Sequence, residues 1–169
     1  MSATPVLPDV LAPGLKVVFC GTAVGRASAK RGAYYAGPGN RFWSVLYRVG
    51  LTPRLFEPQE FPHLLDFEIG LTDLAKHTSG ADTSLGSSDF GVAAFERRIA
   101  RCAPKVLAFN GKKAAQTFYG RSVSYGRQTD GVADTTTFVL PSTSGAAARY
   151  WDESHWRKMA AFAGKIARK

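Results

Sequence analysis

A strand, a glycine-punctuated loop and a helix follow one another within residues 15–49, LKVVFCGTAVGRASAKRGAYYAGPGNRFWSVLYRVG. The β-branched and aromatic run 17–19 predicts the strand, and apolar side chains at helical spacing in 40–49 predict the helix. The glycines between them make 21–39 a loop. In an open α/β sheet such a loop leaves the carboxyl end of a strand, which is where ligands bind. The stretch therefore predicts a ligand site at one edge of a sheet.

The rest of the chain repeats this alternation of strands and helices. In the run KVLAF, residues 105–109, every residue after Lys105 is apolar, as is typical of a strand buried on both faces. The alternation predicts an α/β fold, a three-layer α/β/α sandwich with a mostly parallel central sheet. Further strands are expected at 67–74, 105–109 and 136–140, and further helices near 59–65, after 87–89, from 111 and near the C-terminus.

Length and composition limit the number of domains. The chain has 169 residues, of which 45% are hydrophobic, which is enough for one domain with a substantial core and too few for two of ordinary size. Residues 1–14 contain three prolines and are expected to lie along the surface. Residues 15–169 are expected to form a single domain.

The positive charge is distributed unevenly. The formal net charge is +9, and residues 10–56 hold seven Lys/Arg and no Asp/Glu, while 97–129 hold eight and none. Such positive fields favour the binding of polyanions, and the alternative is a basic surface that is merely solvated. Charge alone does not distinguish nucleic acid from other acidic partners. Arg26 and Lys30 fall in the same loop as two tyrosines, so charges for phosphates and flat rings for bases occur together.

Other patterns disfavour cofactors, metals and membranes. The segment GTAVG, residues 21–25, lacks both the P-loop spacing and the three-glycine dinucleotide fingerprint, so a tight turn is its simplest interpretation and no nucleotide cofactor is expected. Cys20 and Cys102 fall in apolar patterns, and the three histidines share no ligand spacing, so neither a metal nor a disulfide is expected. Without a signal-peptide pattern or a run of bilayer-spanning length, a cytoplasmic location of the bacterial type and no membrane partner are expected.

Five motifs across residues 11–169 have the order and approximate spacing found in one enzyme family. They read LAPGLKVVFCG, GPGNRFW, GLTDL, FNGKKA and VLPSTSG. In these motifs the chain resembles the mismatch-specific uracil/thymine-DNA glycosylases, whose active site is flanked by counterparts of PGNRFW and VLPSTSG. The resemblance implies an α/β/α fold that flips a deaminated pyrimidine out of duplex DNA and hydrolyses its N-glycosidic bond without a metal or other cofactor.

The resemblance also implies a substrate and a partner. The expected activity is DNA repair, in which uracil, with thymine and other damaged pyrimidines as further candidates, is removed from mispaired duplex DNA to leave an abasic site. The chain is expected to act as a monomer, in the cytoplasm with the DNA. Two alternatives stay open: a module that binds damaged or distorted DNA without cleaving it, and a basic α/β enzyme for another phosphorylated substrate. The second would share the fold and charge but not the paired motifs.

The family's base pocket maps onto the first half of the chain. Tyr35 occupies the position of the aromatic residue that stacks on the flipped base, with packing at the base of the loop as the alternative. Backbone amides near Thr22 and Tyr35 would hold the leaving pyrimidine anion. The expected substrate-binding residues are Gly21, Thr22, Ala23, Tyr35, Asn40 and Ser142.

The loop 142–149 resembles the family's minor-groove wedge, which fills the space left by the flipped base. Relatives often carry a bulky apolar residue where this chain has Ala146 and Ala147, so the plug is small or passes to Arg149. The expected DNA-binding residues are Arg26, Lys30, Ser144, Gly145, Ala146 and Arg149.

Ala23 departs from the family pattern, which places at this position an Asn that orients the hydrolytic water. A methyl group cannot orient water, so either activity is lost or strongly reduced, or another polar residue has taken over the water. Asp73 is the first catalytic candidate, because a carboxylate at a strand end can bind water or stabilise positive charge on the sugar; a turn cap is the alternative. Asp89, in the expected loop 76–91, is the second candidate, and Asp82 is another acidic residue of that loop.

Overall fold

The computed structural model describes residues 6–79 and 91–166, and its central sheet has the strand order β2-β1-β3-β5-β4. Strands β2, β1, β3 and β5 run parallel, and β4 pairs antiparallel with β5 at one edge. The α/β fold with a mostly parallel sheet is therefore confirmed. The strands are β1 (Val17–Val24), β2 (Ile69–Ser79), β3 (Val106–Asn110), β4 (Gly126–Arg127) and β5 (Thr136–Leu140).

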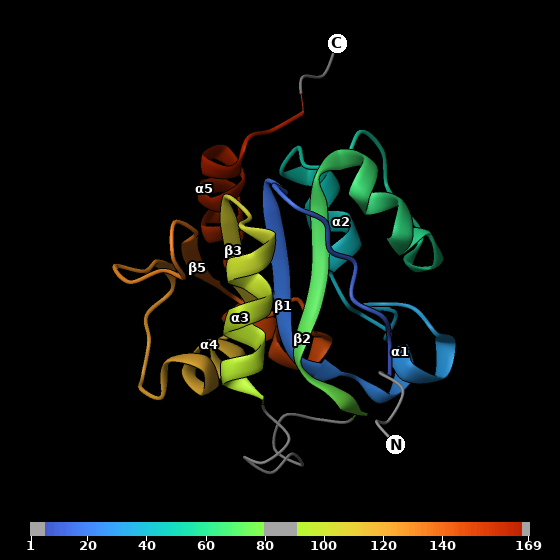
Figure 1. Cartoon of the computed structure of the whole chain (residues 1–169). Coiled ribbons are helices and arrows are strands. Elements are labelled where there is room, and N and C mark those ends of the chain that lie inside the picture. Colours follow the sequence, from blue (N-terminus) through green and yellow to red (C-terminus); the bar gives the residue numbers. More distant parts are fainter. Residues whose placement is uncertain (1–5, 80–90, 167–169) are drawn as a thin grey trace.

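Helices cover both faces of the sheet, with α3 in front of it and α2 behind it in Figure 1. Val17 and Phe19 of β1 contribute to a core with side chains from α2 and α5, whereas Val18 and Cys20 contribute to a core with side chains from α3 and α4. Successive residues of a strand point to opposite faces, so one strand serves both cores of a three-layer sandwich. The helices are α1 (Arg26–Arg31), α2 (Phe42–Arg48), α3 (Val92–Cys102), α4 (Lys112–Tyr119) and α5 (Glu153–Ala163), with 3₁₀ helices η1 (Pro58–Phe67) and η4 (Gly145–Tyr150).

Stacked aromatic rings fill the core on the α2 and α5 face. The ring of Phe19 stacks on Trp156 at 5.5 Å between centroids, and Phe42 meets Phe19 edge-on at 5.2 Å. All three side chains are fully buried. The indole N–H of Trp156 donates to the carbonyl of Pro141 at 3.0 Å, so this core also fixes the backbone directly after β5.

The two long loops expected from composition are shorter than predicted. β1 continues to Val24 and α1 takes up part of 21–39, while β2 continues to Ser79 and so removes the first residues from the expected loop 76–91. Val24 still pairs with Ser79 after a register shift in which β2 has the extra residues. Parallel pairing satisfies the backbone N–H and C=O groups of these residues, and that gain outweighs a composition that is typical of loops.

Part of the N-terminal segment lies in the core, which corrects the surface position expected for residues 1–14. Leu7 and Val10 are only 3% and 6% exposed. The N–H of Val10 donates to the carbonyl of Leu71 and the N–H of Leu71 to the carbonyl of Val10, both at 2.9 Å. Since β2 is the edge strand on this side, the bridge covers backbone groups that would otherwise be open to another chain.

Candidate active site

An open cavity of about 720 Å³ lies at the carboxyl ends of the parallel strands. Each of these strands places a residue in its lining: Ala23 from β1, Asp73 from β2, Asn110 from β3, and Ser142 just after β5. The strand ends lie at the lower edge of the sheet in Figure 1, beside α1. This is the edge at which the strand, loop and helix of residues 15–49 predicted a ligand site.

Most of the predicted site residues line this one cavity. Lys30 and Arg149 are exposed side chains outside its lining, and Asp89 lies outside the described residues. The residues brought together are Gly21, Thr22, Ala23, Arg26, Tyr35, Asn40, Asp73, Ser142, Ser144, Gly145 and Ala146.

Gly21, Asp73 and Tyr35 meet at one point of the lining. Gly21 and Asp73 are register partners in the β1–β2 ladder. A Cβ built on Gly21 would lie 3.3 Å from Oδ1 of Asp73 and 3.7 Å from the hydroxyl of Tyr35. The carboxylate, which belongs to a residue only 3% exposed, and the phenol therefore both approach the space that the glycine leaves open.

Tyr35 is held in place by its ring contacts and its backbone. Its ring lies 4.0 Å from that of Phe42, tilted by 31°, and its φ of 53° is in the left-handed region, a conformation that costs of order 1–3 kcal/mol in a residue other than glycine. Among the described residues its buried hydroxyl makes no well-formed hydrogen bond. Burial raises the pKa of Tyr35 far above its ordinary value and Asp73 raises it further, while the Asn110 side chain acts in the opposite direction. The ring is thus neutral and prepositioned.

The middle of β2, where Asp73 lies, is braced by α3 and the N-terminal segment, whereas the sequence predicted a strand that ends at residue 74. Arg98 donates to the backbone carbonyl of Asp73 at 3.1 Å and pairs with the Asp9 carboxylate at 3.2 Å. The same carboxylate accepts a hydrogen bond of 2.8 Å from the hydroxyl of Thr72. These contacts fix the backbone that presents the Asp73 side chain.

A reciprocal pair of hydrogen bonds ties β3 to the loop after β5. The side-chain amide of Asn110 donates to the Thr143 hydroxyl at 2.9 Å, and the Thr143 N–H donates to the amide oxygen of Asn110 at 3.0 Å. The carbonyl of Thr143 accepts the N–H of Arg41 at 2.8 Å. Nearby, a Cβ on Gly39 would lie 3.7 Å from Cα of Gly145. The motifs PGNRFW and VLPSTSG are therefore in direct contact.

Several lining residues were not predicted as site residues. The rule that selected Asp73, a polar residue at the carboxyl end of a strand, applies equally to Asn110 and could have found it. Tyr125 comes from a stretch without regular periodicity, so no pattern marked it. The unpredicted polar and aromatic lining residues include Asn110, Lys112, Tyr125, Thr143 and Tyr150.

The cavity therefore combines a buried carboxylate, a fixed aromatic ring, an amide and basic side chains. Within residues 6–79 and 91–166 no group of three His, Cys, Asp or Glu side chains is placed to hold a metal. No helix in these ranges is long and apolar enough to cross a membrane. The fold and the cavity define an α/β protein with an enzyme-like site, suited to a flat polar ring beside phosphate groups.

The chain belongs to the uracil DNA glycosylase superfamily, because the model of that family matches residues 8–164. Members of this superfamily are glycosylases that act on DNA. The fold is also similar to the solution NMR structure of a Methanosarcina acetivorans protein that is provisionally named a uracil DNA glycosylase. That likeness has a TM-score of 0.62 at 22% sequence identity and covers 93% of this chain and 94% of the other, and at this identity it supports the fold alone.

Proposed function

We propose that the protein is a monofunctional glycosylase that flips uracil out of mispaired duplex DNA and hydrolyses its N-glycosidic bond, leaving an abasic site. Thymine and other damaged pyrimidines are further candidate substrates. The observation that carries the proposal is the meeting of Asp73, Tyr35 and Gly21 in the cavity of a superfamily member. A base inside the stack cannot reach such a cavity, so the substrate has to be extruded.

The proposed base pocket uses Tyr35 as its stacking surface. Phe42 packs against this ring at 4.0 Å and is itself buried among core aromatics, so the ring has little freedom to move. Stacking on such a ring is worth ~1–3 kcal/mol per base. Backbone amides near Thr22 and Tyr35 would hold the leaving pyrimidine, and Asn40 and Ser142 would contact the nucleotide.

The proposed chemical step assigns Asp73 the function that Asn has elsewhere in the family. The C1′–N bond breaks with its electron pair leaving on the pyrimidine, and the sugar gains oxocarbenium character. The Asp73 carboxylate stabilises that positive charge and orients a water, whose oxygen bonds to C1′ while its released proton neutralises the pyrimidine anion. Substrate and water supply every atom of the products, so no cofactor is needed.

The proposed grip on DNA uses the loop after β5 and basic side chains around the cavity. Ser144 caps η4 by accepting the N–H of Ala146 at 3.2 Å, which orders the backbone of the proposed wedge, including Gly145. Arg26, Lys30 and Arg149 would bind phosphates. The proposal takes the chain as a monomer in which residues 15–169 form a single domain.

Single-turnover excision from uracil-containing duplexes, read out by alkaline strand scission, tests this proposal. We expect Asp73→Ala and Asp73→Asn to lose most activity, and Asp82→Ala and Asp89→Ala to stay near the parent. If only one of the latter two variants is inactive, the catalytic carboxylate belongs to residues 80–90 instead. A panel of opposing bases and single strands determines whether mispairs are preferred.

Ala23 favours one second candidate, a module that binds damaged DNA without cleaving it. In that case the parent would bind an abasic-site analogue but release no base from any substrate. Ala23→Asn would then create activity by restoring an amide that can orient water. An active parent excludes this alternative.

A further inference from the structure

Aromatic and cationic side chains gather on one wall of the cavity, away from the proposed stacking residue Tyr35. Lys112, Tyr125 and Tyr150 line the cavity, and Arg149 lies over the ring of Tyr150. We name these four residues the rim cluster. Lys112 begins α4, Tyr125 lies just before β4, and Arg149 and Tyr150 end η4, so segments far apart in the sequence build the cluster.

Each tyrosine of the rim cluster has a cation close to its ring. The Lys112 ammonium lies 4.4 Å from the ring centroid of Tyr125, and the Arg149 guanidinium lies 5.4 Å from that of Tyr150. Both tyrosines line the same cavity, and burial together with the Tyr150 phenol raises the pKa of Tyr125 above its ordinary value. The two cation–ring pairs therefore border one common cavity.

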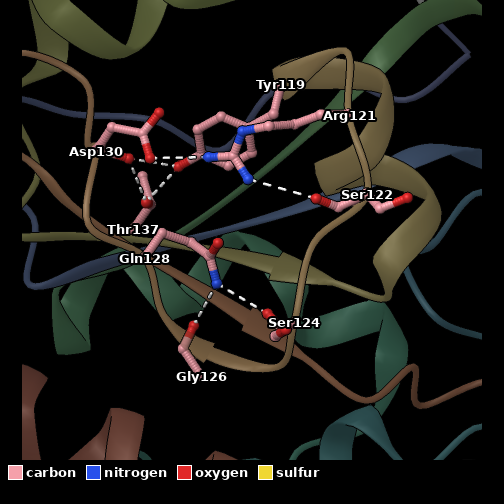
Figure 2. Close-up of polar contacts among 8 residues, drawn as sticks. All are labelled: Tyr119, Arg121, Ser122, Ser124, Gly126, Gln128, Asp130 and Thr137. Carbon is pink, nitrogen blue, oxygen red and sulfur yellow. Dashed lines mark hydrogen bonds and ion pairs between the residues drawn. The ribbon is translucent and has the colours of Figure 1, made fainter.

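The stretch that presents Tyr125 is braced by its own hydrogen bonds, as Figure 2 shows. The side-chain amide of Gln128 donates to the carbonyls of Ser124 and Gly126, at 2.9 and 3.0 Å, and these residues flank Tyr125 on both sides. This position is therefore set before any ligand arrives, which lowers the entropic cost of binding. Further polar contacts of the same stretch join Tyr119, Arg121, Asp130 and Thr137.

Tyr150 leaves most of its ring open. It is 59% exposed, more than any other large hydrophobic side chain in the described part of the chain. Within η4 the residues Ala146, Ala147 and Ala148 are small, and Arg149 is the long side chain that lies over the ring. An exposed ring next to a cavity and under a guanidinium is the arrangement that stacks single-stranded bases.

We propose that the rim cluster binds an unpaired nucleotide of the opened DNA, with its base stacked on Tyr150 and its phosphate held by Arg149 and Lys112. This rests on the proposed function in taking DNA as the partner of the cavity. A paired and stacked base within a duplex exposes no face to a protein ring, so the site selects a base that has lost its pairing. Every base has a π face, so the preference for its identity is weak.

Binding of a short single-stranded oligonucleotide without uracil, followed by fluorescence anisotropy, tests the site without requiring catalysis. We expect Tyr150→Ala to weaken binding by about 5- to 150-fold, the equivalent of ~1–3 kcal/mol of stacking, and Tyr150→Trp to preserve it. Tyr47→Ala is the matched control, because Tyr47 is a partly exposed tyrosine, 38% accessible, that does not line the cavity. Thermal unfolding of each variant establishes that it is folded.

Two further readouts address the chemistry. A 2-aminopurine in the oligonucleotide is expected to be quenched by the parent and by Tyr150→Trp, but not by Tyr150→Ala. Lys112→Gln is expected to lower the slope of log affinity against log salt by about 0.7, the value for one phosphate contact on a single strand. Parent-like binding and quenching by Tyr150→Ala would overturn the proposal, and an unchanged slope would remove Lys112 from it.

The outcome is separable from that of the proposed function. If the parent excises uracil and Tyr150→Ala binds single strands normally, only the rim-cluster proposal fails. If the parent excises nothing but loses single-strand affinity on Tyr150→Ala, only the glycosylase proposal fails.

Discussion

Asp73 faces Gly21 across the β1–β2 ladder, with Oδ1 of the carboxylate 3.3 Å from the point that a Cβ on Gly21 would occupy. Gly21 does not have the positive φ that would demand a glycine for its backbone. The glycine therefore leaves room beside the carboxylate and is not required by the backbone conformation of the strand. A methyl group there is a direct probe of that space.

Gly21→Ala should leave the fold intact and impair the proposed reaction. The new methyl group would be too close to the Asp73 carboxylate, which must shift by a few tenths of an ångström, and it would also contact the Tyr35 hydroxyl. We expect single-turnover uracil excision to fall about 10- to 100-fold, since small displacements of reacting groups have effects of that size. Gly25→Ala is the control, because its Cβ would meet no atom within 4 Å. Equal rates for Gly21→Ala and the parent would show that the carboxylate position is not critical.

Tyr35→Phe should separate the ring of this residue from its hydroxyl. The hydroxyl is buried without a well-formed hydrogen bond among the described residues, and such a group costs about 1–3 kcal/mol. We expect urea denaturation to give Tyr35→Phe an unfolding free energy equal to that of the parent or about 1 kcal/mol higher. Binding of an abasic-site analogue should be unchanged.

Tyr35→Ala should instead weaken binding of uracil-containing DNA more than that of undamaged duplex, by about fivefold or more, because stacking is lost. A lower unfolding free energy for Tyr35→Phe would mean that the hydroxyl is satisfied, with Asn110 as its neighbour.

The parts of the fold that follow from local periodicity could be predicted from the sequence. The run KVLAF at 105–109, apolar after its first residue, predicts a strand buried on both faces, and β3 is found at Val106–Asn110. Pairing between distant segments has no local signature, so the extension of β2 to Ser79 was missed, as was the bridge that buries Val10 against that strand. For the same reason composition alone made 76–79 a loop.

Some residues of the candidate site could likewise be predicted from the sequence, and others could not. Asp73 and Tyr35 were found because a strand end and a family motif mark them. Asn110 also stands at a strand end, but its hydrogen bonds are to Thr143, which lies 33 residues further along the chain. Tyr125 reaches the cavity only through the folding of an irregular stretch, and no pattern in the sequence encodes that position.

Asn110→Ala should loosen the loop after β5. It removes both hydrogen bonds to Thr143, a residue only 1% exposed, and leaves its N–H and hydroxyl without these partners. We expect the unfolding free energy to fall by about 1–3 kcal/mol and the affinity for an abasic-site duplex to fall as well. Thr143→Ser keeps the hydroxyl and is the matched control, expected to lie close to the parent. Parent-like behaviour of Asn110→Ala in both measurements would mean that other contacts hold the loop.

Binding to duplex DNA should depend on salt in proportion to the phosphates contacted by Arg26 and Lys30. Released counterions make log affinity fall linearly with log salt, by about 0.9 for each phosphate contact on B-form DNA. We therefore expect Arg26→Gln and Lys30→Gln each to reduce the slope by about that amount, with little dependence on DNA sequence.

Arg54→Gln is the control for the removal of one exposed positive charge. Arg54 lies outside the cavity lining and donates two hydrogen bonds, of 3.1 and 2.6 Å, to the carboxylate of Glu60, so its loss should leave the slope unchanged. If the affinity of the parent does not change between low and moderate salt, nucleic acid is not its partner. If all three variants keep the slope of the parent, the phosphate contacts lie elsewhere on the basic surface.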